Sequence, residues 1–238
     1  MRASWWSGSG ILFGRSVPDP PGYDGSTSHI EPKSKQVSFK SEEYQCHTVS
    51  SQDQRWTLAY GYAITNDEPQ IFRINEGRVV DTFDGVSPTG GVIANDGTAV
   101  VISNSDSKSG PNRMARIDNC GYHEIDSFNS NLRSPCISVS GDYISVATLP
   151  PSRKVCQYTN NGKHLSTYSF DRITPHLLGY YSSDDVPLLY ITKFENGDPY
   201  LALDTSGVVQ WRSFENYVMR SLTDRIGSWW NHKQNRNS

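Results

Sequence analysis

The sequence lacks the patterns that mark metal sites, membrane spans and secretion. Its cysteines have no Cys-x-x-Cys spacing and no histidine at zinc-finger distance, so we expect structural thiols at Cys46, Cys120, Cys136 and Cys156. No apolar run approaches the roughly 18 residues that a spanning helix needs, and no Asn-x-Ser/Thr sequon occurs. The apolar run 11–13 is far too short for the core of a signal peptide, which favours the cytoplasm.

The sequence also lacks an excess of positive charge. Its 22 basic and 25 acidic side chains leave a net charge of −3, which gives no long-range attraction to nucleic acid or to an anionic membrane. Turn formers and aromatic residues are plentiful, with 19 glycines, 13 prolines and 11% aromatic residues. This composition is typical of a soluble, turn-rich domain with an aromatic and β-branched core. We therefore expect neither a nucleic-acid partner nor a cofactor.

A repeat runs through the chain. Five phenylalanines follow one another at 44, 45, 42 and 44 residues: Phe39, Phe83, Phe128, Phe170 and Phe214. Between them, short apolar or alternating runs return in a fixed order, separated by clusters of Gly, Asn, Asp and Pro, as strands and turns do. Each third strand leads into a tight turn at a glycine, where positive φ costs nothing: Gly77, Gly121, Gly162 and Gly207.

Four strands in about 44 residues predict the blade of a β-propeller. We expect an all-β fold of about four four-stranded antiparallel blades, at about 44–84, 88–128, 134–170 and 175–214. The second strand of each blade is the most apolar and should form the core. The phenylalanines, each at the end of an outer strand, should plug the junctions between neighbouring blades.

Two stretches carry a family resemblance. The repeats "SPTGGVIANDGTAVVIS…ARIDNCGYHEIDSF" and "SPCISVSGDYISVAT…VCQYTNNGKHLSTYSF" resemble blades of the YVTN, NHL and quinoprotein-like propellers, within the broader WD-repeat-like group. The resemblance covers residues 36–214 and lacks the Gly-His and Trp-Asp signatures of true WD repeats. It implies a propeller architecture, but these folds host enzymes, scaffolds and binding modules alike.

The two ends break the period. Residues 1–34 show no sustained periodicity, so we expect a flexible N-terminal tail. Residues 215–238 should form a C-terminal helix, because apolar side chains recur at every fourth position: Phe214, Val218, Leu222, Ile226 and Trp230. This helix should pack on the propeller. The sharper alternative, a membrane-surface or partner helix, is favoured by its basic and tryptophan residues.

Closure of the ring is the open structural question. Residues 36–39 match a fourth strand without its predecessors, so two strands compete for one place in the last blade. Three outcomes follow: a closed four-bladed ring, an open arc capped by the C-terminal helix, or half of a homodimeric ring. We expect the closed ring.

The loops of such blades divide between two sides of the disc. On one side, the first-to-second and third-to-fourth turns repeat the same chemistry. On the other side, the second-to-third loops differ in length and charge, and variable loops on a rigid scaffold are where binding residues concentrate. The candidate binding residues come from these loops and from the links between blades: Asp67, Glu68, Asp106, Arg113, Arg133, Arg153, Lys154, Arg172, Glu195 and Asp198.

The leading functional hypothesis is a non-enzymatic binding module or interaction scaffold that takes a protein partner on the divergent-loop side. The alternative is a metal-assisted hydrolase or lyase whose centre lies in the propeller channel around His47 and His176. A third candidate is a peripheral membrane protein that uses the Trp-bearing ends.

Overall fold

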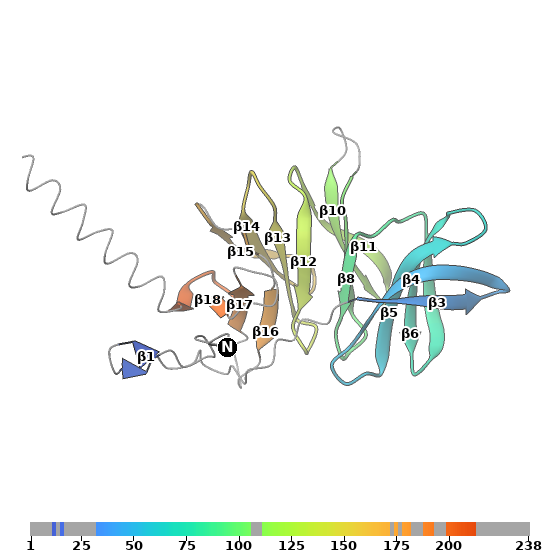
Figure 1. Cartoon of the computed structure of the whole chain (residues 1–238), viewed down its shortest axis with the longest axis horizontal. Coiled ribbons are helices and arrows are strands. Elements are labelled where there is room, and N and C mark those ends of the chain that lie inside the picture. Colours follow the sequence, from blue (N-terminus) through green and yellow to red (C-terminus); the bar gives the residue numbers. More distant parts are fainter. Residues whose placement is uncertain are drawn as a thin grey trace, which may run out of the picture.

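The structure of the chain is a computed structural model that describes residues 11–12, 15–16, 32–105, 111–171, 174–175, 178–181, 188–192 and 199–212. Every regular element in these ranges is a β-strand, and the strands form four large antiparallel sheets and one short pair, β1 (Ile11–Leu12) with β2 (Arg15–Ser16) (Figure 1). We number the large sheets 1 to 4 in chain order.

Sheet 1 has five strands and sheets 2 to 4 have four each, and neighbours in sequence are neighbours in space. Sheet 1 contains β3 (Lys33–Phe39), β4 (Glu42–Ser50), β5 (Trp56–Ala63), β6 (Pro69–Asn75) and β7 (Arg78–Asp84). Sheet 2 contains β8 (Gly90–Ile93), β9 (Ala99–Ser103), β10 (Asn112–Asp118) and β11 (Gly121–Phe128). Sheet 3 contains β12 (Leu132–Ile137), β13 (Tyr143–Thr148), β14 (Lys154–Thr159) and β15 (His164–Ser169). Sheet 4 contains β16 (Leu178–Tyr181), β17 (Leu188–Thr192), β18 (Pro199–Leu203) and β19 (Val209–Arg212).

The repeat inferred from the sequence is confirmed at the level of strands and turns. Each of the four sheets contains four strands in the expected order, with β3 added before the first sheet's four. The four turn glycines all have positive φ, between 79° and 118° at Gly77, Gly121, Gly162 and Gly207. Their recurrence in the sequence therefore has the mechanical cause that was expected, because positive φ at no steric cost is what a tight hairpin needs.

The sheets stand face to face in sequence order, and the contacts between them involve β4 and β5 of sheet 1, the first two strands of sheets 2 and 3, and the first strand of sheet 4. β8 packs on β4 and β5, β12 packs on β8 and β9, and β16 packs on β12 and β13. Within the part of the chain that is described, no comparable packing joins sheet 4 back to sheet 1. The expected closed ring is therefore not what these residues form. They form an open, propeller-like arc with sheet 1 at one end and sheet 4 at the other (Figure 1).

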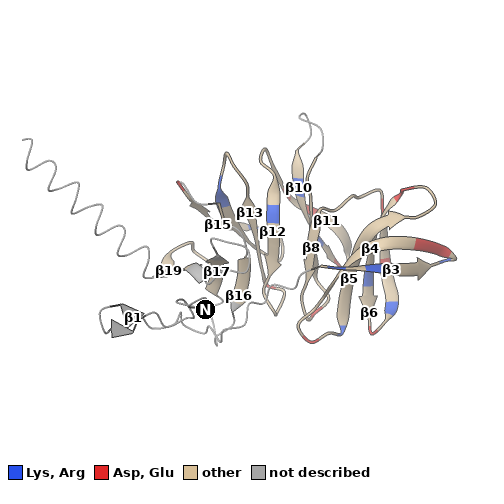
Figure 2. Cartoon of the chain, in the orientation of Figure 1, with Lys and Arg blue, Asp and Glu red and all other residues tan. Residues whose placement is uncertain are grey.

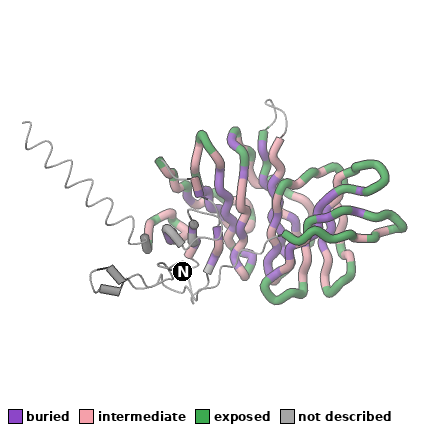
Figure 3. The backbone as a smooth tube through the Cα atoms, in the orientation of Figure 1, coloured by how far each residue is buried: buried purple, intermediate pink, exposed green. Residues whose placement is uncertain are grey.

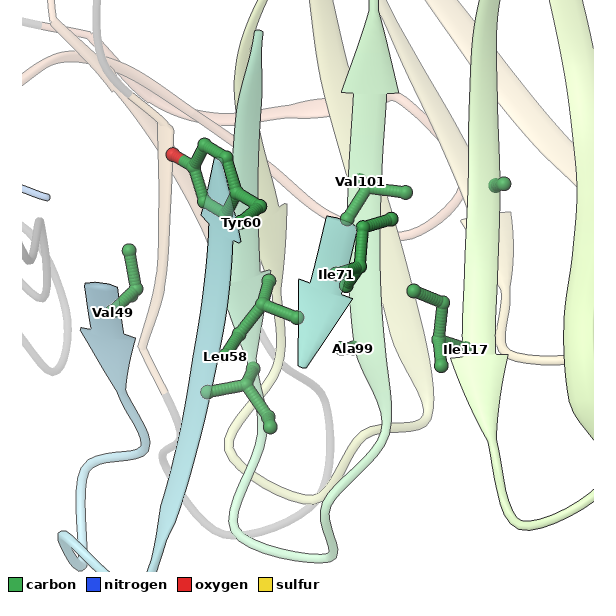
Figure 4. Packing of buried hydrophobic residues seen from close by; sticks show 9 residues of the cluster. Val49, Leu58, Tyr60, Ile71, Ala99, Val101 and Ile117 are labelled. Carbon is green, nitrogen blue, oxygen red and sulfur yellow. The ribbon is translucent and has the colours of Figure 1, made fainter. Parts of the chain in front are cut away.

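Three apolar clusters fill the three junctions of the arc, and buried residues concentrate there (Figure 3). Figure 4 shows the first, in which Leu58 and Tyr60 of sheet 1 meet Val101 and Ile117 of sheet 2. Phe83, Phe128 and Phe170 pack against the first, second and third junctions respectively. The expectation that these phenylalanines plug the junctions is confirmed for those three, whereas Phe214 lies outside the described residues.

Phe39 has a different role, and the reason is the fifth strand of sheet 1. Residues 36–39 belong to β3, which pairs with β4 from Glu42 to Thr48 and not with a last blade. The turn that joins them, Lys40–Ser41, has φ of 49° and 67°. Two consecutive positive φ values define the hairpin turn that usually carries Asn-Gly. The hairpin was missed in the sequence because neither residue favours positive φ.

The β3–β4 hairpin folds over the side of sheet 1 that points away from sheet 2. The rings of Phe39 and Tyr44 lie edge-on to Phe72, with centroids 5.5 Å and 4.9 Å away, and all members of this cluster come from sheet 1. The outward side of the hairpin is wholly exposed and polar: Ser34, Gln36, Ser38, Glu43, Gln45 and His47. The end of the arc is thus covered by its own chain, in the manner of a capping repeat.

Gly61 makes this fold-over geometrically feasible. A Cβ at Gly61 would lie 1.9 Å from the carbonyl oxygen of Gln45 and 2.7 Å from the Cα of Cys46. β4 therefore crosses β5 at a distance that no side chain allows. Glycine inside a strand often marks such a close approach of two backbones.

The expected tail (1–34) and helix (215–238) lie largely or wholly outside the described residues, although β3 already begins at Lys33. Among the residues that the structure describes, no helix is long and apolar enough to span a membrane.

Candidate functional site

The two sides of the arc differ in how their polar groups are used. We call the side with the first-to-second and third-to-fourth turns the turn face. We call the side with the second-to-third loops and the links between sheets the loop face. On the turn face, backbone and side chains of one sheet bond to the next: the Asp53 amide donates to Asn95 Oδ1 at 3.0 Å, and the Asn95 amide donates to the Val139 carbonyl at 3.3 Å.

Arg73 is the strongest of these connections between sheets. It stands on β6 with a side chain only 4% exposed, and its guanidinium binds Asp81 of its own sheet at 2.6 Å. The same group donates to the Gly97 carbonyl at 3.3 Å and to Asn119 Oδ1 at 2.6 Å, both in sheet 2. It also lies over the Trp56 ring, 5.2 Å from the centroid, where a cation is attracted by the ring.

Polar residues at the matching place in the next two sheets make the same kind of connection. Arg116 on β10 donates to the carbonyl of Asn160 in sheet 3 and pairs with Asp118 at 2.9 Å. Gln157 on β14 donates to the carbonyl of Asp204 at 2.8 Å and accepts from the Tyr180 hydroxyl at 3.2 Å, both in sheet 4. Each sheet is thus held to the next by one third-strand side chain.

The pKa of Asp53 is lowered by hydrogen bonds within the β4–β5 turn. Asp53 accepts hydrogen bonds from the Ser51 hydroxyl at 2.7 Å and from Arg55 Nε at 2.6 Å. These bonds, that of Ser51 first, lower its pKa to about 2, because they favour the ionised carboxylate. The side chains of the turn face are therefore largely occupied in holding the scaffold together.

The loop face leaves its charges exposed. Asp67 and Glu68 lie in the β5–β6 loop, where the Ala63 amide donates to the Glu68 carbonyl at 2.9 Å, and both side chains point to solvent. Asp67 has φ of 56°, a conformation that Asp tolerates in turns. Two exposed apolar residues flank this loop: Tyr62 at 44% and Ile64 at 52%.

The basic candidates lie closer to the strands than expected. Arg113 is the second residue of β10, not a loop residue, and its side chain pairs with Glu124 at 3.3 Å. Arg133 is in β12, not in a link between sheets, because β12 begins at Leu132. Arg153 closes the β13–β14 loop with φ of 44°, and Lys154 opens β14 with an exposed side chain. The remaining candidates, Asp106, Arg172, Glu195 and Asp198, lie outside the described residues.

Each sheet carries charges of both signs (Figure 2), for example Lys40 at the hairpin tip of sheet 1 and Glu124 in sheet 2, but the candidate residues of the loop face divide by sign between the sheets. Acidic residues of this face gather at sheet 1 around the hydroxyl of Tyr44: Glu42, Glu68 and Asp84. The hydrogen bond that Tyr44 donates to Glu42, together with burial and the neighbouring carboxylates, raises the pKa of Tyr44 to about 12. The basic candidates belong instead to sheets 2 and 3. The structure therefore brings Asp67 and Glu68 together with the hairpin tip, but places them in a different sheet from the arginines.

The described histidines and cysteines do not come together as a metal site. His47 is exposed on β4 with its ring 5.7 Å from that of Tyr60, and His176 lies outside the described residues. No group of three His, Cys, Asp or Glu side chains placed to hold a metal occurs in the described ranges. All four cysteines are free thiols, and burial raises the pKa of Cys46 to about 11 and of Cys136 to about 12.

Sequence reasoning missed the bridging residues Arg73, Arg116 and Gln157. A signal existed, since each is a long polar residue directly between two apolar residues of a third strand and lies four or five positions before the turn glycine. The pattern alone could not show that their partners lie in the following sheet.

No model of a known protein family matches the chain, and no curated protein matches it in sequence. Similar solved structures include hydrazine synthase of Kuenenia stuttgartiensis, with 10% identity over 68% of this chain and 58% of that chain and a TM-score of 0.48. The β-propeller domain of Cps50 (Swd1) from Myceliophteria thermophila has 11% identity, covers 63% of this chain and 51% of that one, and has a TM-score of 0.42.

A gluconolactonase of Xanthomonas campestris has 10% identity over 77% of this chain and 84% of that chain, with a TM-score of 0.42. The chain spans little more than half the length of the first two of these structures. At such TM-scores the likeness carries no argument about function. The description of the chain as an all-β protein of four antiparallel sheets therefore rests on its own strands.

Proposed function

We propose that the chain is a binding module that takes a protein partner on its loop face. The observation that supports this is the contrast in the use of polar groups. On the turn face, the bridging side chains form hydrogen bonds between one sheet and the next. On the loop face, Asp67, Glu68 and Lys154 are exposed and make no ion pair within the described residues. Exposed charges beside exposed apolar residues are typical of a protein-binding surface.

The charge segregation gives this proposal a specific form. A partner that spans the face would place basic groups against the hairpin tip and the Glu68 loop, and acidic groups against Lys154 and the arginines of sheets 2 and 3. Complementary potentials mainly raise the association rate and fix the orientation. Binding should therefore weaken with ionic strength, since exposed charges are screened over about 8 Å at physiological salt.

The test is affinity capture with matched charge reversals. Glu68→Lys together with Lys154→Glu should abolish recovery of a partner that the unmodified protein captures at low salt. The control is Glu76→Lys together with Lys163→Glu, two exposed residues beside turn-face glycines, which likewise leaves the net charge unchanged and should leave recovery intact. Loss of the partner with the control pair alone would place binding on the turn face and overturn the proposal.

A further inference from the structure

The two ends of the arc are finished differently. The outer side of sheet 1 is covered by its own β3–β4 hairpin, and Ala59 and Phe72 beneath it are 0% exposed. At the other end, one row of register partners in sheet 4, Gly179, Tyr190, Ala202 and Trp211, lies on the side opposite to the junction with sheet 3. No strand of another sheet packs on that side among the described residues.

Ala202 stands at the position that the bridging residues hold in the other sheets. It lies five residues before its turn glycine, as Arg116 and Gln157 do, and the bulge that follows Arg73 and Gln157 also follows Ala202. Alanine cannot reach another sheet. Sheet 4 therefore lacks the side chain that would hold a fifth sheet, or sheet 1 of another copy, in the way that sheets 1 to 3 hold their successors.

Ala202 is nevertheless 0% exposed, whereas Val208 at the adjacent turn is 56% exposed. In this row Ala202 stands between Tyr190 and Trp211, and Gly179 lies two strands away. The row contains no Arg or Gln that could bond to another sheet as Arg73 and Gln157 do, so an apolar helix face can lie along it. The chain supplies a candidate next to it, because residues 213–238 follow directly after β19, the outer strand of sheet 4.

The apolar stripe from Phe214 to Trp230 has the dimensions for this surface. As a helix, these residues would extend about 25 Å at 1.5 Å per residue. Four strands at about 4.8 Å spacing measure roughly 19 Å across. We propose that residues 214–230 dock as an amphipathic helix on the outer side of sheet 4, along the row that contains Ala202, and cap the arc at this end as the β3–β4 hairpin caps it at the other.

A second copy of the chain is the less suitable occupant. Ring closure by two arcs would bring sheet 4 against sheet 1 of the partner copy, and the side of sheet 1 that faces outward there is the exposed polar surface of the hairpin. Burying such groups without partners is unfavourable. The capped arc is therefore a monomer, and this inference does not depend on what the loop face binds.

The test is amide hydrogen exchange of the full chain, with mass determined by light scattering. In Leu222→Asp with Ile226→Asp, amides of β17 and β18 should exchange about tenfold faster or more, because local opening of sheet 4 becomes easier. Amides of β5 should not change. The control, Asn216→Asp with Ser228→Asp, adds the same charge on the opposite side of the helix and should leave both sheets unchanged.

Unchanged exchange in β17 and β18 of the stripe variant would overturn the proposal. So would a wild-type dimer that Ala202→Arg converts to a monomer, since a second copy would then be the occupant. Faster exchange in β5 as well would show that the two aspartates unfold the whole chain. In that case the docking is tested with the milder variant Leu222→Ala with Ile226→Ala. That milder pair should speed exchange several-fold in sheet 4 alone, and equal exchange in all four sheets would contradict the docking.

Discussion

The turn face and the loop face are built from the same four repeats, yet their polar residues differ in environment. Those of the turn face mostly bond to a neighbouring sheet, whereas several on the loop face are exposed to solvent. On the turn face, Arg73, Gln157 and Asn95 each bond to a group in a neighbouring sheet. On the loop face, Asn104 makes a comparable link, to both backbone groups of Leu132 at 2.7 and 2.9 Å. On the same face Asp67, Glu68 and Lys154 are exposed, whereas Arg133 and Arg153 are half-buried.

Under the proposed function, this difference separates stability from recognition within one arc. Side chains that are buried and bonded resist substitution, because removing one leaves its partners unsatisfied. Exposed charges on loops can change with little effect on folding. The comparison can be tested by substitutions that move from the turn face to the loop face, with a steadily smaller expected effect on the free energy of unfolding.

The largest effect is expected at Arg73. Arg73→Ala leaves Asp81, the Gly97 carbonyl and Asn119 without their shared partner. Because Asp81 is 36% exposed, we expect the free energy of unfolding to fall by about 3 kcal/mol, the lower end of the cost of breaking a buried pair, measured by urea denaturation. A loss below about 1 kcal/mol would show that the bridge contributes no more than a surface ion pair.

The next effect concerns Gly97, whose φ is 87° and whose added Cβ would lie 2.5 Å from the Trp56 ring. Gly97→Ala combines backbone strain with displacement of that ring and should cost about 2 to 3 kcal/mol. Gly77→Ala is the control, because its φ of 79° is similar but nothing lies within 4 Å of the new Cβ. It should cost about 1 kcal/mol. Equal losses in urea denaturation would mean that the contact with Trp56 does not matter.

A smaller effect is expected at Asn95, which accepts the Asp53 amide across the first junction. Asn95→Ala removes one exposed hydrogen bond and should cost about 1 kcal/mol. Asn66→Ala on the loop face removes a bond to the amide of Glu68 within a single loop. The free energy of unfolding should fall by about half as much or less, because this hydrogen bond lies within one loop and does not join two sheets. A thermal melt of both variants makes the comparison.

Asp53 should make the stability of the fold depend on pH in the acid range. Its pKa of about 2 in the folded chain is below its ordinary value of 3.8, so it stabilises the fold above pH 3.8 and that contribution is lost as the pH falls toward 2. The melting temperature of the wild type should exceed that of Asp53→Asn at pH 5, and the gap should close by pH 2. A gap that stays constant over this range would contradict the role of the ionised carboxylate.

The smallest effects belong to the loop face. Glu68→Lys and Lys154→Glu, made singly, should change the free energy of unfolding by less than about 0.5 kcal/mol, because both side chains are exposed. Urea denaturation checks this, with Arg73→Ala measured under the same conditions. A loss above about 1 kcal/mol at either residue would end the division between a structural face and a recognition face.

Much of the fold could be predicted from the sequence because its determinants are local. Strand order, the turn glycines and the plugs at Phe83, Phe128 and Phe170 all follow from alternation, turn chemistry and period. The β3–β4 hairpin could not be found in this way. Its turn, Lys40–Ser41, adopts positive φ without a residue that favours it, and the covering of Phe72 by Phe39 is a tertiary contact.

The candidate site was predictable in part for the same reason. The loop that carries Asp67 and Glu68 lies where turn signals placed it, so its exposure was expected. Arg113 and Arg133 entered strands because pairing extended beyond the apolar core of each strand. The partners of Arg73 and Gln157 lie 24 and 47 positions further along the chain, a separation that local patterns do not encode.

The self-covered first sheet also bears on how the chain reaches its fold. In a ring that closes through its two ends, the first sheet completes its packing only after the last strand has been added. Here sheet 1 completes its own outer cluster with β3 and β4, and in the described part of the chain each later sheet packs on the sheet that precedes it in sequence. Contacts between near neighbours in sequence form quickly. The arc can therefore assemble sheet by sheet from its N-terminal side, as the chain leaves the ribosome.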